Sequence, residues 1–453
     1  MRKLIIAAAA LVIIQGAQAQ SGGLSPYSRF GIGVLDNPGG ATHAGMGGLT
    51  TPVWDAFSIN FSNPATYSSL FRTTFQLGVG GSFLTLSDSA RSQQVNGGGI
   101  NEFGFVFKKQ GSRWAFALGL VPYSSVNYSL SQKTTQDSIG DILYTYDGDG
   151  GLNKAIAGVS RAFRLGPTRI DSKAHRLSIG ANVGYFFGSL QQSRKVIFSD
   201  VNYYQTRINS FTSIYGLAAD VGLHYLRPLH EERDQEKLIR SDNLIGALTY
   251  SVGNNLSAKF TELAESFYYF SQVEVPLDTA SFTDDVKGKV VLPERIAVGI
   301  GYVHTNRDQG YVMVGLDFKT QDWTKYTSRF GDTEIPGNLH RSSMFSIGME
   351  IVPKTVEKSK NFLDRNTYRL GFRNTQTYLL LRDREITEMA VTAGISLPMI
   401  SSKSTSKFNL AVEFGSGGTT EHDLLRQNFV NIMAGFSFSP HVLNNWFVSR
   451  KYE

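Results

Sequence analysis

The 453-residue chain contains no cysteine, so disulfide bonds and thiolate metal sites are excluded. After residue 14 it has no long apolar run, and its mean hydropathy is −0.15, so we expect no transmembrane helix. Charge of one sign is not concentrated anywhere: the net charge is +6, but lysine and arginine are scattered rather than arranged in stripes. The last observation argues against nucleic-acid binding.

The first residues have the features of a secretory signal peptide. Arg2 and Lys3 precede an apolar core from Leu4 to Ile14, and Ala17-Gln18-Ala19 forms a small-x-small cleavage pattern. The apolar core is too short for a membrane anchor, which needs about 20 residues. We therefore expect residues 1–19 to direct export and then to be removed.

The rest of the chain alternates between apolar and polar or small residues. From Arg176 to Gly188, one face carries Leu177, Ile179, Ala181, Val183, Tyr185 and Phe187, and Phe186 is the one large apolar side chain on the other. The same alternation recurs at Phe211–Leu226, Ile296–Val303, Phe345–Ile351, Met389–Leu397, Phe408–Phe414 and Val430–Phe438. A period of two indicates β-strands with one apolar face. Many segments reach ten residues, which is typical of membrane strands of about 9–11 residues.

The segments between the strands also fit a barrel in a membrane. Assigned alternately to two sides, one set is mostly longer and includes Ser124–Leu152, Ser189–Ser210 and Gly253–Leu292. The other set is mostly shorter and includes Lys108–Arg113 and Ile400–Lys407. Outer-membrane barrels have long extracellular loops, short periplasmic turns and an even number of strands. The sequence therefore predicts an all-β fold, a transmembrane antiparallel β-barrel of about 14 strands with both chain ends in the periplasm.

Aromatic residues near the strand ends suggest the girdles of such a barrel. They are Trp114, Tyr123, Tyr128, Tyr185, Tyr225, Tyr250, Tyr302, Trp323 and Tyr368. A soluble β-sandwich or propeller is the alternative, but no blade repeat is present and the chain begins with an export pattern.

Residues 20–70 precede the first strand and contain many turn-forming residues, as in "GGATHAGMGGLTT" and "INFSNPATYSSL". Such a segment cannot lie in lipid, where its backbone polar groups would be unsatisfied. A barrel of this size has a lumen that must hold either water or a plug. A disordered periplasmic tail is the alternative, but apolar residues are too frequent for one. We predict that residues 20–70 form a plug, and the turn residues Asn60, Asn63, Pro64 and Ala65 are candidate gating residues.

No constellation for catalysis or metal binding emerges. Asp220 and His224 share a strand face, but four residues span about 13 Å, too far for an acid–base pair. The acids of "YDGDGG", Tyr146–Gly151, lack the remaining ligands of a calcium loop. We therefore expect no catalytic residues, no metal ligands and no cofactor.

Three motifs together resemble the FadL-type outer-membrane transporters of hydrophobic compounds. They are the small-residue stretch that ends in Asn63-Pro64-Ala65, "VLPERIAVGIGY" from Val291 to Tyr302, and "GLDFKTQDWTKY" from Gly315 to Tyr326. The resemblance implies a 14-stranded barrel with an N-terminal hatch and a substrate path that leaves sideways through the wall. We carry no substrate-contacting residue over from the family.

These observations predict a non-enzymatic channel in the outer membrane of a Gram-negative cell for passive uptake of small hydrophobic molecules, fatty-acid-like or aromatic. Its parts would be the signal peptide (1–19), the plug (20–70), the barrel (71–440) and a periplasmic tail (441–453). The expected partners are outer-membrane lipid, lipopolysaccharide, a small hydrophobic ligand and possible envelope proteins, but not nucleic acid. The alternative is a non-transporting accessory barrel in an outer-membrane protein secretion or assembly complex.

Overall fold

The computed structural model describes residues 25–440, except 37–38, 138, 167–174, 201, 235–236, 272, 308–309, 355–360 and 401–403. The predicted signal peptide and the predicted tail at 441–453 lie outside these residues. In the described part of the chain, no helix is both long and apolar enough to cross a membrane.

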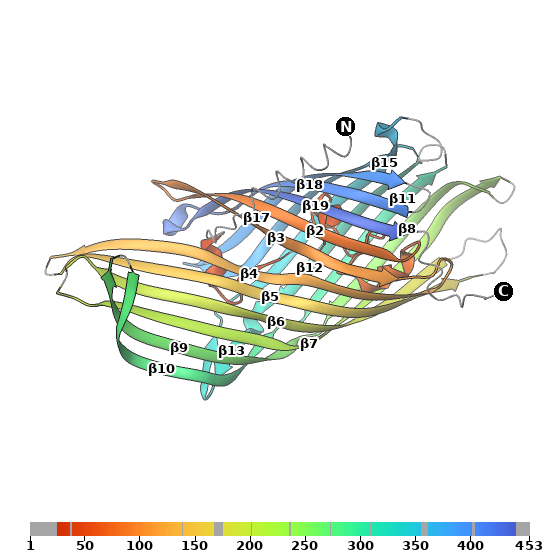
Figure 1. Ribbon diagram of the computed structural model, residues 1–453. Helices are drawn as coiled ribbons and strands as arrows, with labels where there is room; N and C mark the ends of the chain where they lie inside the picture. The colour runs from red at the N-terminus through yellow and green to blue at the C-terminus, as the bar shows by residue number, and fades with distance from the viewer. Residues whose placement is uncertain are drawn as a thin grey trace, which may run out of the picture.

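The structure is a closed antiparallel β-barrel of strongly tilted strands (Figure 1). Its strands are β2 (Thr74–Ser87), β3 (Ser92–Phe107), β4 (Trp114–Gln136), β5 (Gly140–Leu165), β6 (His175–Phe198), β7 (Gln205–Asp234), β8 (Lys237–Ser251), β9 (Asn254–Phe270), β10 (Val273–Leu292), β11 (Arg295–Asn306), β12 (Gly310–Asp322), β13 (Thr327–Phe330), β14 (Thr333–Pro336), β15 (Arg341–Val352), β16 (Thr367–Leu381), β17 (Arg384–Ile400), β18 (Ser404–Gly418) and β19 (Arg426–Pro440). Pairing of β19 with β2 closes the ring.

Four barrel strands are each interrupted once, so the wall has 14 strands, as predicted. The long strand β7 pairs with β9 through its first half and with β8 through its second, which places β8 and β9 end to end. In the same way, β10 and β11 lie end to end as two parts of one barrel strand, and so do β12 and β13, and β14 and β15. The short 3-10 helix η3 (Trp323–Lys325) causes one of these breaks; η4 (Leu363–Arg365) and η5 (Glu421–Asp423) lie in connections.

Alternation along the strands separates an outer apolar face from an inner polar face, as the sequence predicts. On β6, Val183 is 62% exposed on the outside, whereas Ser178 and Asn182 are buried inside. Phe186, the exception in the pattern, is buried on the inner face. The outer face therefore suits lipid, and the inner face suits a polar lumen.

Several predicted connections are in fact strands. Gly253–Leu292 contains β9 and β10, and Ser124–Leu152 contains the paired ends of β4 and β5. Together they form a sheet that continues the wall beyond the part whose outer face is apolar, called the apolar band below. This sheet is visible at the left of Figure 1. The prediction failed because most of β10 is exposed on both faces, so water on both sides removes the period of two.

The predicted aromatic girdle is correct only in part. Trp114, Tyr185, Tyr250 and Tyr302 are exposed on the outside, but Tyr128 and Trp323 are buried. Trp323 stacks on Tyr378 with the ring centroids 4.6 Å apart, and Tyr123 packs edge-to-face on the inward Phe186. These aromatic side chains belong to an interior cluster, which also includes Tyr27 and Ile32 from the N-terminal part of the chain.

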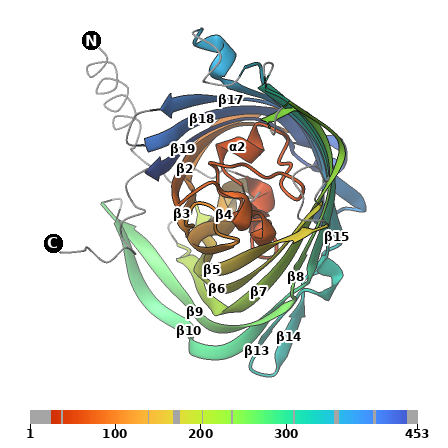
Figure 2. The same cartoon turned by 90° about the vertical axis from the view of Figure 1, so that its right-hand side faces the viewer.

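Residues 25–70, called the N-terminal segment below, lie inside the ring of strands (Figure 2). The segment contains η1 (Pro26–Arg29), β1 (Val34–Leu35), α2 (Ala41–Ala44) and η2 (Pro64–Ser69). Most of its described side chains are buried. Its apolar residues pack against the inner wall; Phe61 and Tyr67, for example, join a cluster with Val106 and Ile156.

Candidate functional site

The Asn63–Ala65 turn fits closely against the inner wall. The Asn63 side chain caps η2 by accepting a hydrogen bond from the Ala65 N–H (3.1 Å), and its Nδ2 donates to the Thr51 carbonyl (2.8 Å). Pro64 is the first residue of this helix, where its fixed φ is favourable. The wall residues that face this turn are Gly180 and Gly222. A Cβ at Gly180 would overlap the Pro64 carbonyl group, and a Cβ at Gly222 would overlap Asn63 Oδ1.

Asn60 and Ala65, the other two predicted site residues, are also buried in this region. Asn60 Nδ2 donates to the carbonyls of Thr50 (2.8 Å) and Val53 (3.0 Å), and so closes the preceding loop. The Ala65 carbonyl accepts from Ser160 Oγ on β5 at 2.8 Å. The structure thus brings all four residues together inside the barrel, and their gating role stays a prediction.

Asp317 on β12 provides an anchor for the N-terminal segment that the sequence pattern does not reveal. Its Oδ2 accepts hydrogen bonds from the backbone N–H groups of Thr50 and Thr51, both at 3.1 Å, and from Thr50 Oγ1 at 3.3 Å. Lys319 lies on the same strand, with Nζ 3.5 Å from Asp317 Oδ2 and 2.9 Å from the Gly48 carbonyl. The alternation of "GLDFKTQ" already places Asp317 and Lys319 on the inner face, but nothing in it indicates what they would bind.

Further ion pairs and hydrogen bonds hold the segment to the wall. Lys407 on β18 lies 3.0 Å from an oxygen of Asp55. Burial alone would raise the pKa of Asp55, but the Lys407 ammonium and the Arg369 guanidinium together lower it, so the carboxylate stays charged. At the end of η2, the Ser68 carbonyl accepts from both Lys108 and Arg176. These cations suit the partial negative charge of exposed carbonyls at a helix end.

The wall itself separates between β3 and β4. These strands pair only from Phe103 to Phe107 and from Phe116 to Leu120; beyond that, within the described residues, β3 has no partner except β2. A bulge at Asn101 of β3 accompanies the separation. Bulges bend strands and end pairing.

The N-terminal segment occupies part of the free edge of β4. Val34 and Leu35 pair with Ser125 and Ser124, and the Ser25 N–H donates to the Asn127 carbonyl at 3.1 Å. From this edge the segment reaches across to β19, where Ser25 Oγ exchanges hydrogen bonds with the Gln427 side chain at 3.0–3.1 Å. Residues 25–35 therefore form a strap between β4 and β19.

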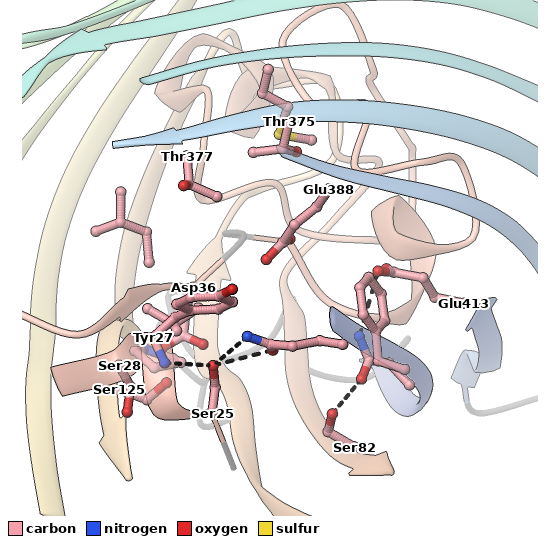
Figure 3. A pocket seen from close by; sticks show the side chains of 18 of the residues that line it. Ser25, Tyr27, Ser28, Asp36, Ser82, Ser125, Thr375, Thr377, Glu388 and Glu413 are labelled. Atoms are coloured by element: carbon pink, nitrogen blue, oxygen red, sulfur yellow. Dashed lines mark hydrogen bonds between the residues drawn. The ribbon is translucent and has the colours of Figure 1, made fainter. Parts of the chain in front are cut away.

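A cavity of about 510 Å³ lies between this strap, the separated strands and the opposite wall (Figure 3). Its lining includes apolar side chains such as Val34, Leu35, Ile100, Met344, Phe429 and Met433, and glycines 80, 81 and 97–99 of β2 and β3. Asp36, Glu388 and Glu413 extend toward it in Figure 3, and Arg295, Lys319 and Arg373 also line it. Burial raises the pKa of Asp36 to about 6. The cavity is thus largely apolar with charged groups on its walls.

Asp220 and His224, which share a strand face, have separate partners. Asp220 binds Lys154 at 2.6 Å, and His224 Nε2 lies 3.3 Å from the Pro52 carbonyl, so the two do not contact each other. Among the described residues, no three His, Asp or Glu side chains are grouped to hold a metal ion.

The sequence model of a family described as BamG matches residues 1–453, the whole chain. No curated protein matches. Solved structures with the same fold include two toluene transporters. TbuX of Ralstonia pickettii is 18% identical with a TM-score of 0.54, and the match covers 89% of this chain and 99% of TbuX. TodX of Pseudomonas putida is 19% identical with a TM-score of 0.54, and the match covers 89% of this chain and 98% of TodX. A FadL homologue of Pseudomonas aeruginosa is also similar, with 12% identity and a TM-score of 0.53, and the match covers 91% of this chain and 99% of that one. The predicted resemblance to the FadL-type fold is therefore confirmed.

Proposed function

The chain belongs to the BamG family and has the fold of FadL-type channels, and from these premises we propose that it is an outer-membrane channel for small hydrophobic molecules. Uptake would run down a concentration gradient without a cofactor. The N-terminal segment would be the gate, with the Asn63–Ala65 turn against the wall and Asn60 closing the loop before it.

One observation carries this proposal: the cavity reaches the place where β3 and β4 separate. Residues of both separated strands line it, including Gly99 and Ile100 of β3 and Pro122 and Ser125 of β4, and Ser125 also pairs with Val34 of the strap. Its volume is in the range of about 300–1,000 Å³ that small-molecule sites occupy. A hydrophobic molecule in the cavity could enter the membrane sideways between the strands and would not need to cross the filled lumen.

Filling the cavity tests the proposal. Gly99 lines the cavity, and a Cβ added there meets no atom within 4 Å, so we expect Gly99→Phe to fold normally. The ring would obstruct the route, and liposome uptake of toluene and of a fluorescent fatty acid should fall roughly tenfold. Gly246→Phe is the matched control, because Gly246 also faces open space but lies away from the cavity. Equal uptake by both variants and the wild type would exclude this route.

The second candidate is the accessory barrel, and two observations favour it. The designation BamG points to the assembly of outer-membrane proteins, and the matching model covers the whole chain. The second observation concerns the sheet that continues the wall at the β9–β10 end. Within the described part of the chain, residues 273–287 of β10 pair with β9 on one side only, and Val273, Leu277 and Phe282 are exposed. An unpaired edge with exposed apolar residues suits a protein partner.

Purification from native membranes separates the two candidates. If the barrel serves in assembly, a protein partner should co-purify at fixed stoichiometry, and disrupting the exposed surface with Leu277→Asp and Phe282→Asp should release it. If the barrel transports, it should purify without such a partner and carry lipid-like molecules inside. The double variant would then leave uptake unchanged, since both residues lie outside the cavity.

A further inference from the structure

An arginine stands within the outward-facing apolar band of the wall. Arg161 of β5 is exposed and lies directly across from Trp114 of β4 and Ile179 of β6. Both neighbours are outward-facing, with 45% and 39% exposure. The antiparallel register therefore places a guanidinium in a row of side chains that otherwise suits lipid.

Apolar rows lie on both sides of Arg161. Toward the middle of the wall, the next row contains Val159 and the 56%-exposed Phe116; toward the strand end, Phe163 and Leu165 follow on β5. Two residues along a strand advance about 7 Å, so Arg161 lies one or two rows inside the edge of the band. This is the end of the barrel at which β2 begins and β19 finishes.

Two aromatic rings fix the direction of the side chain. The Arg161 guanidinium carbon lies 4.8 Å from the Trp114 ring centroid and 4.7 Å from that of Phe163. Phe163 is nearer the strand end, so the guanidinium leans toward the membrane surface, as long cationic side chains near a membrane edge do. Within the described residues, no carboxylate forms an ion pair with Arg161.

A charge that faces lipid is destabilising at the membrane centre and is tolerated near the surface. Arg161 is held by two rings and aimed at the surface, and it has no carboxylate partner among the described residues. Such an arginine fits a phosphate diester, to which guanidinium can donate two parallel hydrogen bonds. We propose that Arg161, with Trp114 and Phe163, binds the headgroup phosphate of a phospholipid in the leaflet at this end of the barrel. The exposed Arg113 and Arg164, at the same strand ends, add positive potential.

Native mass spectrometry of the purified barrel with added phosphatidylglycerol tests this site. We expect Arg161→Gln to weaken phosphatidylglycerol binding about fivefold, the effect of about 1 kcal/mol per arginine near a lipid surface. Arg161→Lys should bind with intermediate affinity, because it keeps the charge but loses the flat stacking. The matched control is Arg341→Gln, which removes an arginine that is 70% exposed and makes only a 3.9 Å ion pair with Asp322. Heat modifiability checks that each barrel is folded.

Further ligands identify what is bound. Diacylglycerol has the same acyl chains without phosphate, and Arg161→Gln should not change its binding; an equal loss would overturn the proposal, since the residue would then contribute apolar contact only. Inorganic phosphate should not compete at millimolar concentration; full competition would indicate a site for free phosphate. If lipid A displaces phosphatidylglycerol and binds more tightly, the assignment to a phospholipid is wrong.

Discussion

Gly222→Val should displace the Asn63–Ala65 turn from the wall and open the lumen to ions. A side chain at residue 222 would overlap Asn63 Oδ1, and its nearest neighbours also include Pro64 Cδ at 2.9 Å and the Ala65 nitrogen at 3.1 Å. Overpacking of this kind costs about 1–3 kcal/mol. The barrel keeps its closed ladder of strand pairing, so the overpacking destabilises the contact between the N-terminal segment and the wall and leaves the barrel folded. Conductance in planar bilayers should rise roughly tenfold.

The matched control is Gly246→Val on the neighbouring strand β8. A Cβ at Gly246 has no neighbour within 4 Å, so the same change of glycine to valine should leave conductance unaltered. Both variants should remain folded by heat modifiability. If the Gly222→Val barrel is folded and no leakier than Gly246→Val, the turn does not seal the lumen.

Asp317→Ala should release the Thr50–Thr51 loop. The variant loses an acceptor of three hydrogen bonds and leaves the Lys319 ammonium without its carboxylate in a buried site. Breaking a buried ion pair by removing one partner costs about 3–5 kcal/mol. We expect this loss to appear as faster proteolysis of the N-terminal segment and as frequent opening events in single-channel recordings, with barrel strand content unchanged by circular dichroism.

Asp317→Asn separates the hydrogen bonds from the charge. The amide keeps one acceptor oxygen for the Thr50 and Thr51 N–H groups but no longer neutralises Lys319, so its effect should lie between those of the wild type and Asp317→Ala. Equal proteolysis rates in all three proteins would show that the segment is held elsewhere, for example by Asp55 and Lys407.

The sequence predicted the wall well where lipid lies on one side of a strand and the lumen on the other. Alternation on β6 predicts the exposed Val183 and the buried Asn182, as the structure has them. The prediction failed on β10, because most of this strand is exposed on both faces and so has no apolar period to detect. It also failed for Trp323 and Tyr128, since an aromatic residue near a strand end fits the lipid interface and a packed interior equally well.

The sequence by itself determined that this chain forms a membrane barrel, how many strands it has, and that Asn63 and Pro64 make a turn, because these follow from periodicity and local backbone chemistry. Only the tertiary structure decided where β3 parts from β4, that the strap covers the free edge of β4, and that Asp317 receives the Thr50–Thr51 loop. Asp317 and Thr50 are 267 residues apart in sequence. Contacts over such separations depend on barrel closure, because closure sets the register of every strand at once. They therefore cannot be predicted from a local sequence pattern.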